Sequence, residues 1–494
     1  MIYWDAARLA EAAGARLLAG AGPAGSTVAG SEGPADMRAK GPQRATIDSR
    51  AVQPGDLFVG LTGAREDGGA YAAQALQAGA WGVLVAPEHA EALAAVKAPG
   101  TVLAHSHPLI ALQALARAWR GELGAKVVAI TGSTGKTSTK DILAAVLGNQ
   151  LRTAASAQNL NTEIGLPLAV LAAPPGTEAL VLELAMRGPG QIAQLMAIAQ
   201  PDVGVIVNVG PVHLELLGSL EAVAAAKAEL IAGLEAGSTV VVPHGELLLD
   251  PYRREDLRTV TFGEQGDVRL LVQEPGEIVV GVGEMRLTLQ PSFGQSHNLR
   301  NLLAAIAAAD ALGVTPEGRL EVAFSALRGQ RIALQDEIVL IDDCYNANPM
   351  SMRAALDDLA DTAPARRVAV LGDMLELGPR EKDFHREVGA YAHARGVDLL
   401  LAVGSLAAEM GKGFDGQELH HVPDAQRAAE LLPGLLRPRD TVLVKGSRGV
   451  GLERVARALT GEQALTGEQA LTGEQALTGE QALTGEQTLT HEES

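Results

Sequence analysis

The segment Thr131–Ser138 constrains this chain more than any other stretch of its sequence. It reads Thr-Gly-Ser-Thr-Gly-Lys-Thr-Ser. The apolar run Val127–Ile130 before it predicts a strand, and the alanine-rich stretch Lys136–Asn149 predicts an amphipathic helix. A strand, a glycine-rich loop and a helix in this order are the context of a phosphate-binding loop. The full motif has a glycine where Ile130 stands, and a chance glycine-rich turn is the alternative.

The loop has the groups that a nucleoside triphosphate needs. Backbone N–H groups converge on an anion, Lys136 reaches the terminal phosphates, and the Thr137 hydroxyl binds Mg²⁺. We therefore assign ATP binding to the loop residues Gly132, Ser133, Thr134, Gly135, Lys136, Thr137 and Ser138. Because such a loop holds the terminal phosphates, reaction at the γ-phosphate is favoured. A kinase, an NTPase and a ligase that works through an acyl phosphate all remain open at this point.

The rest of the chain predicts an α/β protein of three domains. With 494 residues, 47% of them hydrophobic and only 3% aromatic, the cores must be built from Ala, Val, Leu and Ile, which suits helices packed on parallel strands. We predict a small α/β domain at 1–104, a parallel-sheet ATP-binding domain at 105–330, and a Rossmann-like doubly wound domain at 331–459. The repeat of Leu-Thr-Gly-Glu-Gln-Ala at 460–494 predicts a disordered tail without chemistry.

Charge and cysteine content limit the partners. A formal net charge of -19 disfavours nucleic acid and anionic membranes. The one cysteine, Cys344, permits neither an internal disulfide nor a thiolate zinc cluster. We see no signal peptide and no apolar run long enough for a membrane helix. We therefore expect a cytoplasmic monomer that acts on small molecules.

Three further residues follow apolar strands in the middle of the chain. Glu183 ends the run Ala179–Leu184, where an acid could hold Mg²⁺. His213 closes the segment Asn-Val-Gly-Pro-Val-His, and Lys227 lies fourteen residues later. Each also has an ordinary interpretation, because many strands end in an acid, a single histidine is often structural, and a lysine on an alanine-rich helix is usually at the surface.

Polar groups also follow later strands. Asn298 and Asn301 share a helix face, where they could contact adenine or cap the helix. Asp343, Asn346 and Asn348 lie in Asp-Asp-Cys-Tyr-Asn-Ala-Asn-Pro, which turn chemistry alone could also explain. The segment Lys445-Gly-Ser-Arg448-Gly is a cationic loop suited to a carboxylate.

Taken together and in order, these segments resemble the Mur ligases of peptidoglycan synthesis. The resemblance spans about residues 45 to 458. It includes Asp48-Ser49-Arg50 with Pro-Gly-Asp-Leu-Phe-Val, the phosphate loop, Val-Leu-Gly-Asp-Met-Leu-Glu-Leu-Gly and Val-Lys-Gly-Ser-Arg-Gly. It implies an ATP- and Mg²⁺-dependent enzyme that joins a carboxylate to an amine.

The resemblance also implies residue roles. Lys136, His213 and Lys227 become catalytic, with Lys227 carbamylated, and Thr137, Glu183, His213 and Lys227 hold Mg²⁺. The nucleotide also contacts Asn298, Asn301, Arg331 and Asp343. The substrate-binding residues are Ser49, Arg50, Asn161, Thr162, Arg187, Asn346, Asn348, Lys445 and Arg448.

The motifs of the third domain favour a particular amine. They are similar to those of the family members that add D-alanyl-D-alanine to UDP-N-acetylmuramoyl-tripeptide. A member that adds one amino acid, a folylpolyglutamate synthase-like ligase and a non-catalytic regulator are the alternatives. Three positions depart from the family pattern: Cys344 replaces a serine, Thr162 an asparagine and Gly69 a histidine. The Gly69 change falls in the part of the chain that the resemblance assigns to the UDP-sugar.

Overall fold

A computed structural model describes residues 4–19, 41–63, 66–157 and 159–461 of the chain. These residues form three sheets of five, ten and six strands, most of them paired in parallel. The predicted α/β class is confirmed. The predicted tail lies almost entirely outside the described residues.

The first sheet has the strand order β1-β5-β4-β3-β2. Strands β2 to β5 are parallel and β1 is an antiparallel edge. The strands are β1 (Arg16–Ala19), β2 (Arg44–Thr46), β3 (Asp56–Val59), β4 (Gly82–Val85) and β5 (Thr101–Ala104). The helices are α1 (Ala6–Ala13), α3 (Ala72–Gln77) and α4 (Pro87–Ala95), with a 3₁₀ turn at Gly68–Tyr71. All residues of β3 and β4 are buried, as continuous apolar parallel strands require.

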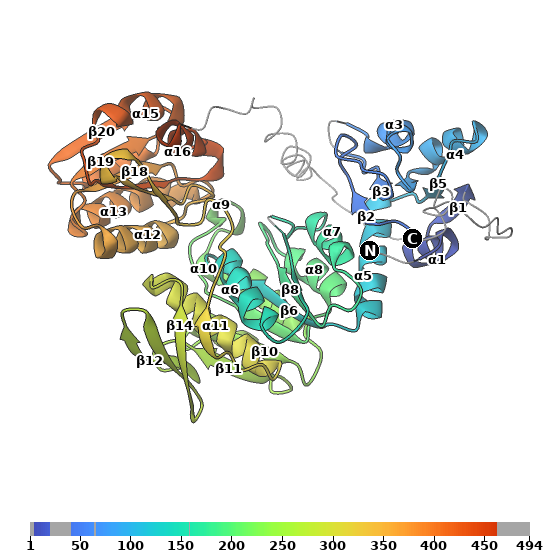
Figure 1. The fold of residues 1–494 in the computed structure, drawn as a ribbon, viewed down its shortest axis with the longest axis horizontal. Coiled ribbons are helices and arrows are strands. Elements are labelled where there is room, and N and C mark those ends of the chain that lie inside the picture. Colours follow the sequence, from blue (N-terminus) through green and yellow to red (C-terminus); the bar gives the residue numbers. More distant parts are fainter. Residues whose placement is uncertain (1–3, 20–40, 64–65, 158, 462–494) are drawn as a thin grey trace, which may run out of the picture. The chain divides into compact units, whose positions relative to one another are not determined.

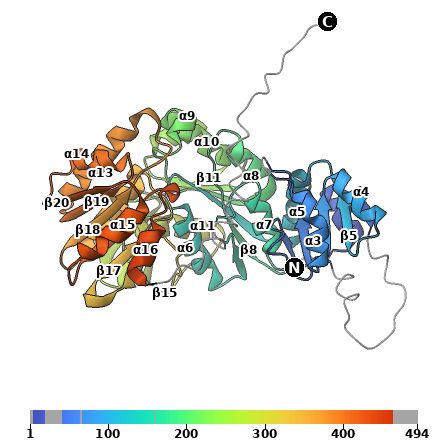
Figure 2. The same ribbon diagram turned by 90° about the horizontal axis from the view of Figure 1, so that it is seen from above.

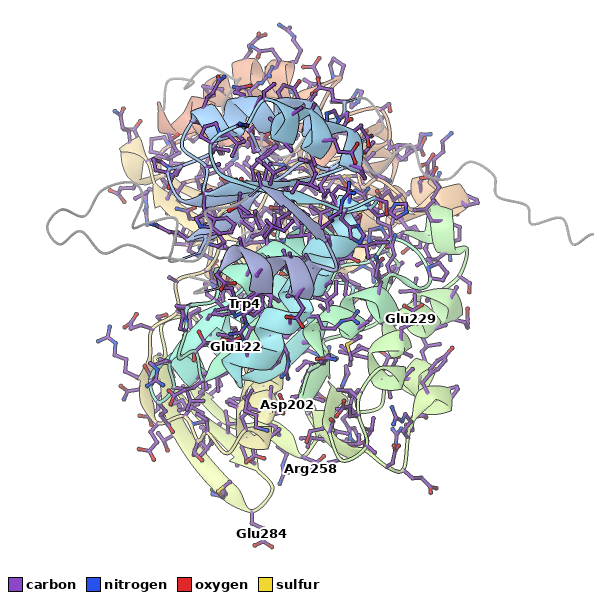
Figure 3. The ribbon with its side chains drawn as sticks, turned by 90° about the vertical axis from the view of Figure 1, so that its right-hand side faces the viewer. Trp4, Glu122, Asp202, Glu229, Arg258 and Glu284 are labelled. Atoms are coloured by element: carbon purple, nitrogen blue, oxygen red, sulfur yellow. The ribbon has the colours of Figure 1, made fainter. Side chains whose placement is uncertain are left out.

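Two helices beyond the first sheet belong to the same compact unit, which comprises the chain up to Ala125 and Asn159–Glu178. They are α5 (Pro108–Leu123) and α7 (Gly165–Ala172). The Trp4 ring lies edge-on to that of Trp119, with centroids 5.6 Å apart, and its indole N–H donates to Glu122 at 2.8 Å (Figure 3). These contacts tie α5 to the N-terminal segment. The boundary proposed after residue 104 stays a prediction.

The ten-stranded sheet belongs to the second compact unit, and its first half matches the predicted pattern. The parallel strands are β6 (Lys126–Thr131), β7 (Thr153–Ala155), β8 (Ala179–Glu183), β9 (Val203–Ile206), β10 (Thr239–Pro243) and β11 (Arg258–Phe262). The helices are α6 (Lys136–Gly148), α8 (Gln191–Ala199), α9 (Leu214–Leu217), α10 (Leu220–Ala232) and α11 (Ser296–Ala311), with a 3₁₀ turn at Leu247–Tyr252. Helices α6 and α11 pack together over the core of this sheet (Figure 1).

The second half of this sheet differs from the expected strand–helix alternation. Residues 268–291 form an antiparallel meander, β12 (Val268–Glu274), β13 (Glu277–Val282) and β14 (Met285–Pro291), and β15 (Gly318–Leu320) closes the edge. Gly276 and Gly283 have positive φ and form the two tight turns. Glu284 lies at the tip of the second turn (Figure 3). These turns are too short for a helix, so the strands pair directly.

The six-stranded sheet is doubly wound, as predicted. Its order is β16-β17-β21-β18-β19-β20, and only β16 is antiparallel. The strands are β16 (Gln330–Ala333), β17 (Val339–Asp342), β18 (Arg367–Gly372), β19 (Leu399–Val403), β20 (Glu418–Val422) and β21 (Thr441–Lys445). The helices are α12 (Pro349–Thr362), α13 (Glu381–Ala394), α14 (Met410–Gly413), α15 (Ala425–Leu431) and α16 (Glu453–Thr460). Helices α12 and α13 cover one face and α15 and α16 the other (Figures 1 and 2), each over its own core.

Within the described part of the chain, no helix combines the length and the apolarity that a membrane crossing requires. The phosphate loop, Glu183 and the polar segments after β17 and β21 follow the carboxyl ends of parallel strands, which is where open α/β sheets bind ligands. Asn298 and Asn301 instead lie on α11, after the antiparallel meander.

Candidate active site

The loop between β6 and α6 has the backbone of an anion-binding turn. Gly135 has φ 76°, a conformation that favours glycine, and it directly precedes the first residue of α6. A side chain on Gly135 would also collide with the Asn301 side chain, because its Cβ would lie 2.6 Å from the Asn301 Oδ1. The loop therefore delivers its N–H groups and the positive end of a 13-residue helix to one place.

Asn208, in the loop after β9, holds this turn in shape. Its Oδ1 accepts from the Ser133 and Thr134 N–H groups at 3.0 and 2.9 Å, and its Nδ2 donates to the Thr134 carbonyl and hydroxyl oxygens at 3.1 and 3.0 Å. The Ser133 hydroxyl donates to the Gly210 carbonyl at 3.0 Å. These bonds join the loop after β6 to the loop after β9, which lie side by side because the two strands pair in parallel.

Lys136 and Thr137 begin α6, and Ser138 follows in the same turn. The Lys136 ammonium donates to the Gly132 carbonyl at 2.8 Å. Burial lowers the Lys136 pKa, and the nearby Arg328 charge adds to this, whereas Glu183 opposes it. A poorly solvated cation at the loop binds a phosphate more strongly than one in water does.

Glu183 lies where a metal ligand is needed. It ends β8, is only 2% exposed, and accepts from the Thr137 hydroxyl at 2.8 Å. Its register partner on β6 is Ile130, the residue just before the loop. A carboxylate and a hydroxyl oxygen are hard ligands of the kind that Mg²⁺ prefers. The structure therefore brings together the phosphate loop and two of the four predicted metal ligands.

The other two predicted ligands have different surroundings. Lys227 is buried on α10, and burial together with the Lys136 charge lowers its pKa well below the usual lysine range. This excludes the surface-lysine interpretation. His213 precedes α9, and its Nδ1 is hydrogen-bonded to the Glu376 carboxylate. This bond, above all, lowers the Glu376 pKa.

No group of three or more His, Cys, Asp or Glu side chains suited to a metal is found within the residues that the structure describes. Glu183 and His213 therefore belong to no such group of three. The predicted Mg²⁺ site depends on Thr137 and Glu183, together with oxygens that a nucleotide would bring.

Asn298 and Asn301 are both buried on the first turns of α11. The Asn301 Nδ2 donates to the Asn298 Oδ1 at 3.4 Å, and Asn301 abuts Gly135 of the loop. Gln295, not either asparagine, precedes the helix, and no side chain caps it. The capping alternative is therefore wrong, and a nucleotide-facing role for the pair stays a prediction.

Arg331, which the sequence predicts to contact the nucleotide, and its neighbour Arg328 have different partners. The Arg331 guanidinium donates to both Asp358 carboxylate oxygens at 2.8 and 2.9 Å, and so anchors β16 to α12. Arg328 instead donates to the Thr137 hydroxyl at 3.3 Å and lies over the Tyr345 ring at 3.9 Å. The sequence analysis did not name Arg328, which lies three residues before Arg331.

The polar cluster after β17 and β21 forms one network. The Lys445 ammonium donates to the Asp343 carboxylate at 2.7 Å and to the Asn346 carbonyl at 3.0 Å. Asn348 caps α12, because its Oδ1 accepts from the Ser351 N–H at 3.0 Å. The Lys445 side chain is 3% exposed and that of Arg448 is 38% exposed. Arg448 is therefore the more accessible cation of this loop.

The remaining predicted substrate residues lie in both compact units. Ser49 and Arg50 follow β2, where the Arg50 guanidinium pairs with Asp48 through two bonds of 2.9 and 3.0 Å. Asn161 and Thr162 precede α7, and the Thr162 hydroxyl accepts from the Gly165 N–H at 3.3 Å. In the other unit, Arg187 follows β8, with its guanidinium 3.9 Å from Glu376.

Three domain models of one family match the chain. The model "Mur ligase family, catalytic domain" matches residues 43–120, "Mur ligase middle domain" matches 130–309, and "Mur ligase, glutamate ligase domain" matches 327–448.

Curated relatives match along nearly their whole length. The chain is similar to proteins named UDP-N-acetylmuramoyl-tripeptide–D-alanyl-D-alanine ligase from Synechocystis (39% identity over 84% of this chain and 91% of that protein) and Bacillus subtilis (36%, 83% and 92%). The Escherichia coli protein of that name is 34% identical, with 84% and 93% covered.

Solved structures agree with these matches. MurF from Acinetobacter baumannii superposes with a TM-score of 0.79 at 27% identity, covering 93% of this chain and 99% of that one. MurF ligase from Thermotoga maritima, solved in complex with ADP, gives 0.73 at 29% identity, with 86% and 98% covered.

Proposed function

The chain belongs to the Mur ligase family, and we propose that it is the member that joins D-alanyl-D-alanine to UDP-N-acetylmuramoyl-tripeptide with consumption of ATP. The observation that carries this proposal is the hydrogen bond between Thr137 and Glu183 beside Lys136 on the phosphate loop. It supports the proposal because a hydroxyl and a carboxylate suited to Mg²⁺ then lie beside a cation suited to phosphate.

The proposed reaction has two steps. A carboxylate oxygen of the tripeptide attacks the γ-phosphorus of ATP, the bond to the β-phosphate oxygen breaks, and ADP leaves. The amine nitrogen of the dipeptide then attacks the acyl phosphate carbonyl, phosphate leaves, and the nitrogen loses a proton. Lys136 stabilises the charge that develops on the transferring phosphoryl group, and the loop N–H groups fix its position.

The residues present fit Mg²⁺, which when bound neutralises charge on the phosphate oxygens. Thr137 and Glu183 would hold it, and the Nε2 of His213 is a further candidate ligand, because the bond to Glu376 occupies only its Nδ1. Two protein oxygens suffice, because Mg²⁺ sites in nucleotide enzymes take their remaining oxygens from phosphates and water.

Lys227 is proposed to be carbamylated. Its lowered pKa favours the neutral form of the amine, and a neutral amine can attack CO₂ to form an N–C bond with loss of a proton. The product is an anion. Since Lys227 lies close enough to Lys136 for their charges to interact, the carbamate would replace repulsion by attraction.

The dipeptide is proposed to bind at the loop after β21. A dipeptide carries its carboxylate farther from its amine than one amino acid does. Arg448 is the accessible cation there, and it can bind a carboxylate in bidentate fashion. Lys445 would act indirectly, since it holds Asp343 and the Asn346 carbonyl in place. The roles proposed for Asn346 and Asn348 rest on their lying in the same segment.

The test supplies UDP-N-acetylmuramoyl-tripeptide, ATP and Mg²⁺, and measures phosphate release with D-alanyl-D-alanine, D-alanine, L-lysine and D-glutamate separately. We expect the highest kcat/KM with the dipeptide, and an Arg448→Ala variant should raise the KM for the dipeptide alone. Faster turnover with any single amino acid would contradict the proposal. We also propose that the enzyme acts in the cytoplasm as a monomer, which light scattering of the purified chain would check.

A further inference from the structure

The carboxyl edge of the first sheet brings together three polar segments. Ser49 and Arg50 follow β2, Asp67 and Gly69 follow β3, and His89 lies in the first turn of α4, directly after β4. Because these strands are parallel neighbours, all three segments lie at the same edge. Ligands of open α/β sheets bind at such edges.

Asp67 holds the His89 ring in one orientation. One carboxylate oxygen accepts from the Gly69 N–H at 3.0 Å, and the other lies 2.6 Å from the His89 Nε2. The His89 bond is the largest cause of the lowered Asp67 pKa. An ionised carboxylate can only accept, so the His89 Nε2 carries the proton and the other ring nitrogen, Nδ1, is left for a further partner.

Gly69 is the reason that the ring can lie there. A Cβ on Gly69 would be 2.3 Å from the His89 Cδ2 and 2.8 Å from its Nε2. On its other side, a Cβ on Gly60 would be 2.8 Å from the Gly69 Cα. The space beside Gly69 therefore has room for one side chain, and the His89 ring from α4 occupies it. The resemblance had placed a histidine at position 69 itself.

The same edge carries an accessible cation. The Arg50 charge interacts with that of Glu66, the residue before Asp67 in the loop after β3, and the Tyr71 hydroxyl donates to Glu66 at 3.2 Å. The His89 side chain is 25% exposed. A fixed imidazole and a guanidinium at one rim suit an anionic, hydrogen-bonding ligand.

We infer that His89, oriented by Asp67 and admitted by Gly69, is a substrate-binding residue for the UDP-sugar, and that its imidazole takes the place of a side chain at position 69. This inference rests on the proposed function for the identity of the ligand. It assigns binding to a residue on α4, an element that the sequence motifs do not include.

The test moves the imidazole between two backbone positions. The variants are His89→Ala, Gly69→His and the double variant Gly69→His/His89→Ala, with His107→Ala as the matched control on an exposed histidine of the same unit. For each, the KM for UDP-N-acetylmuramoyl-tripeptide, kcat, the Kd for UDP by calorimetry without ATP, and the Tm are measured. The Kd for UDP tests His89 independently of the reaction.

We expect His89→Ala to raise KM and the Kd for UDP about ten-fold, the usual effect of losing one hydrogen bond to a charged or polar ligand, with kcat little changed. Gly69→His should bind UDP and the substrate as weakly as His89→Ala does, because its new ring and the His89 ring compete for one space. The double variant should return to within about three-fold of the parent.

A role that is only structural would lower Tm without raising KM. If His89→Ala does not fold, His89→Gln keeps a donor to Asp67 but lacks the ring nitrogen, and its KM should still rise several-fold. A parent-like KM in a folded His89→Ala or His89→Gln variant overturns the inference, and so does a folded double variant that stays as weak as His89→Ala. If the parent binds UDP but does not turn over the tripeptide, the proposed function fails and the UDP arm still decides the role of His89.

Discussion

The amide of Asn208 holds the phosphate loop, so Asn208→Ala tests the site without removing any group that we place on the phosphates. The side chain is 9% exposed and makes four hydrogen bonds to Ser133 and Thr134. Truncation removes all four, whereas the bond from the Ser133 N–H to the Asn208 backbone carbonyl, at 3.2 Å, remains.

The expected magnitude follows from this count. A protein hydrogen bond contributes about 0.5–1.5 kcal/mol net, so four give about 2–6 kcal/mol. Water can replace some of them, because Thr134 is only half-buried. We therefore expect the free energy of local opening of the loop to fall by about 2–3 kcal/mol, which corresponds to amide exchange that is about 30- to 150-fold faster at Ser133 and Thr134.

Hydrogen exchange of the loop is the right assay, because global unfolding of a chain with three sheets need not be two-state. The KM for ATP should rise in parallel. Asn208→Asp keeps the acceptor for both N–H groups but loses the two bonds that Nδ2 donates, and it adds a negative charge beside the phosphates. Exchange should therefore become faster by less than in Asn208→Ala, while the KM for ATP still rises. Gln290→Ala, on the exposed face of β14, is the control. Parent-like exchange and KM in Asn208→Ala would refute the argument.

Five further outcomes are expected. Lys136→Ala should abolish phosphate release with unchanged circular dichroism, since water cannot replace a charge-assisted contact to the transferring phosphoryl group; near-normal release would show that the loop is misassigned. Lys227→Ala should be nearly inactive and partly rescued by short-chain carboxylic acids, whereas full activity would return Lys227 to a structural role. In bicarbonate-free buffer Lys227→Met should have a higher free energy of unfolding than the parent, because burial lowers the folded-state pKa of Lys227 and the unfolded parent therefore binds more protons. This difference in unfolding free energy should shrink as the pH rises toward the usual lysine range. A difference that is independent of pH would contradict the reasoning. Arg328→Ala should lower kcat by about ten-fold or more, while Arg331→Ala should mainly lower Tm through the lost Asp358 pair, and the reverse pattern would restore the original assignment. Deleting 462–494 should change neither activity nor Tm, and a large loss of either would show that the tail docks.

Local sequence determined the strands and the loops that follow them. Apolar runs such as Val127–Ile130 are buried on both faces of a parallel sheet, and only a continuous hydrophobic segment tolerates that environment. Glycine at position 135 and the polar residues after each strand then identify the binding edge, because the topology of parallel sheets brings their carboxyl ends together. For this reason Lys136, Thr137 and Glu183 could be named together without a structure.

The antiparallel meander of β12 to β14 was not expected. Its residues lie within 105–330, which the sequence predicts as a parallel-sheet domain, although Gly276 and Gly283 mark two tight turns. Short strands of mixed polarity carry little periodic signal, and their pairing is decided by neighbouring strands and by burial against α11.

Contacts between distant segments were decided only by the tertiary structure. The pairing of His213 with Glu376, the approach of Arg328 to Thr137, and the His89 ring beside Gly69 each join residues that no local pattern links. The separation along the chain between Arg328 and Thr137 is 191 residues. Which polar side chain fills a given space depends on the packing of whole elements. The sequence therefore determined the chemistry of the phosphate loop, and the fold decided which arginine contacts Thr137 and which histidine packs beside Gly69.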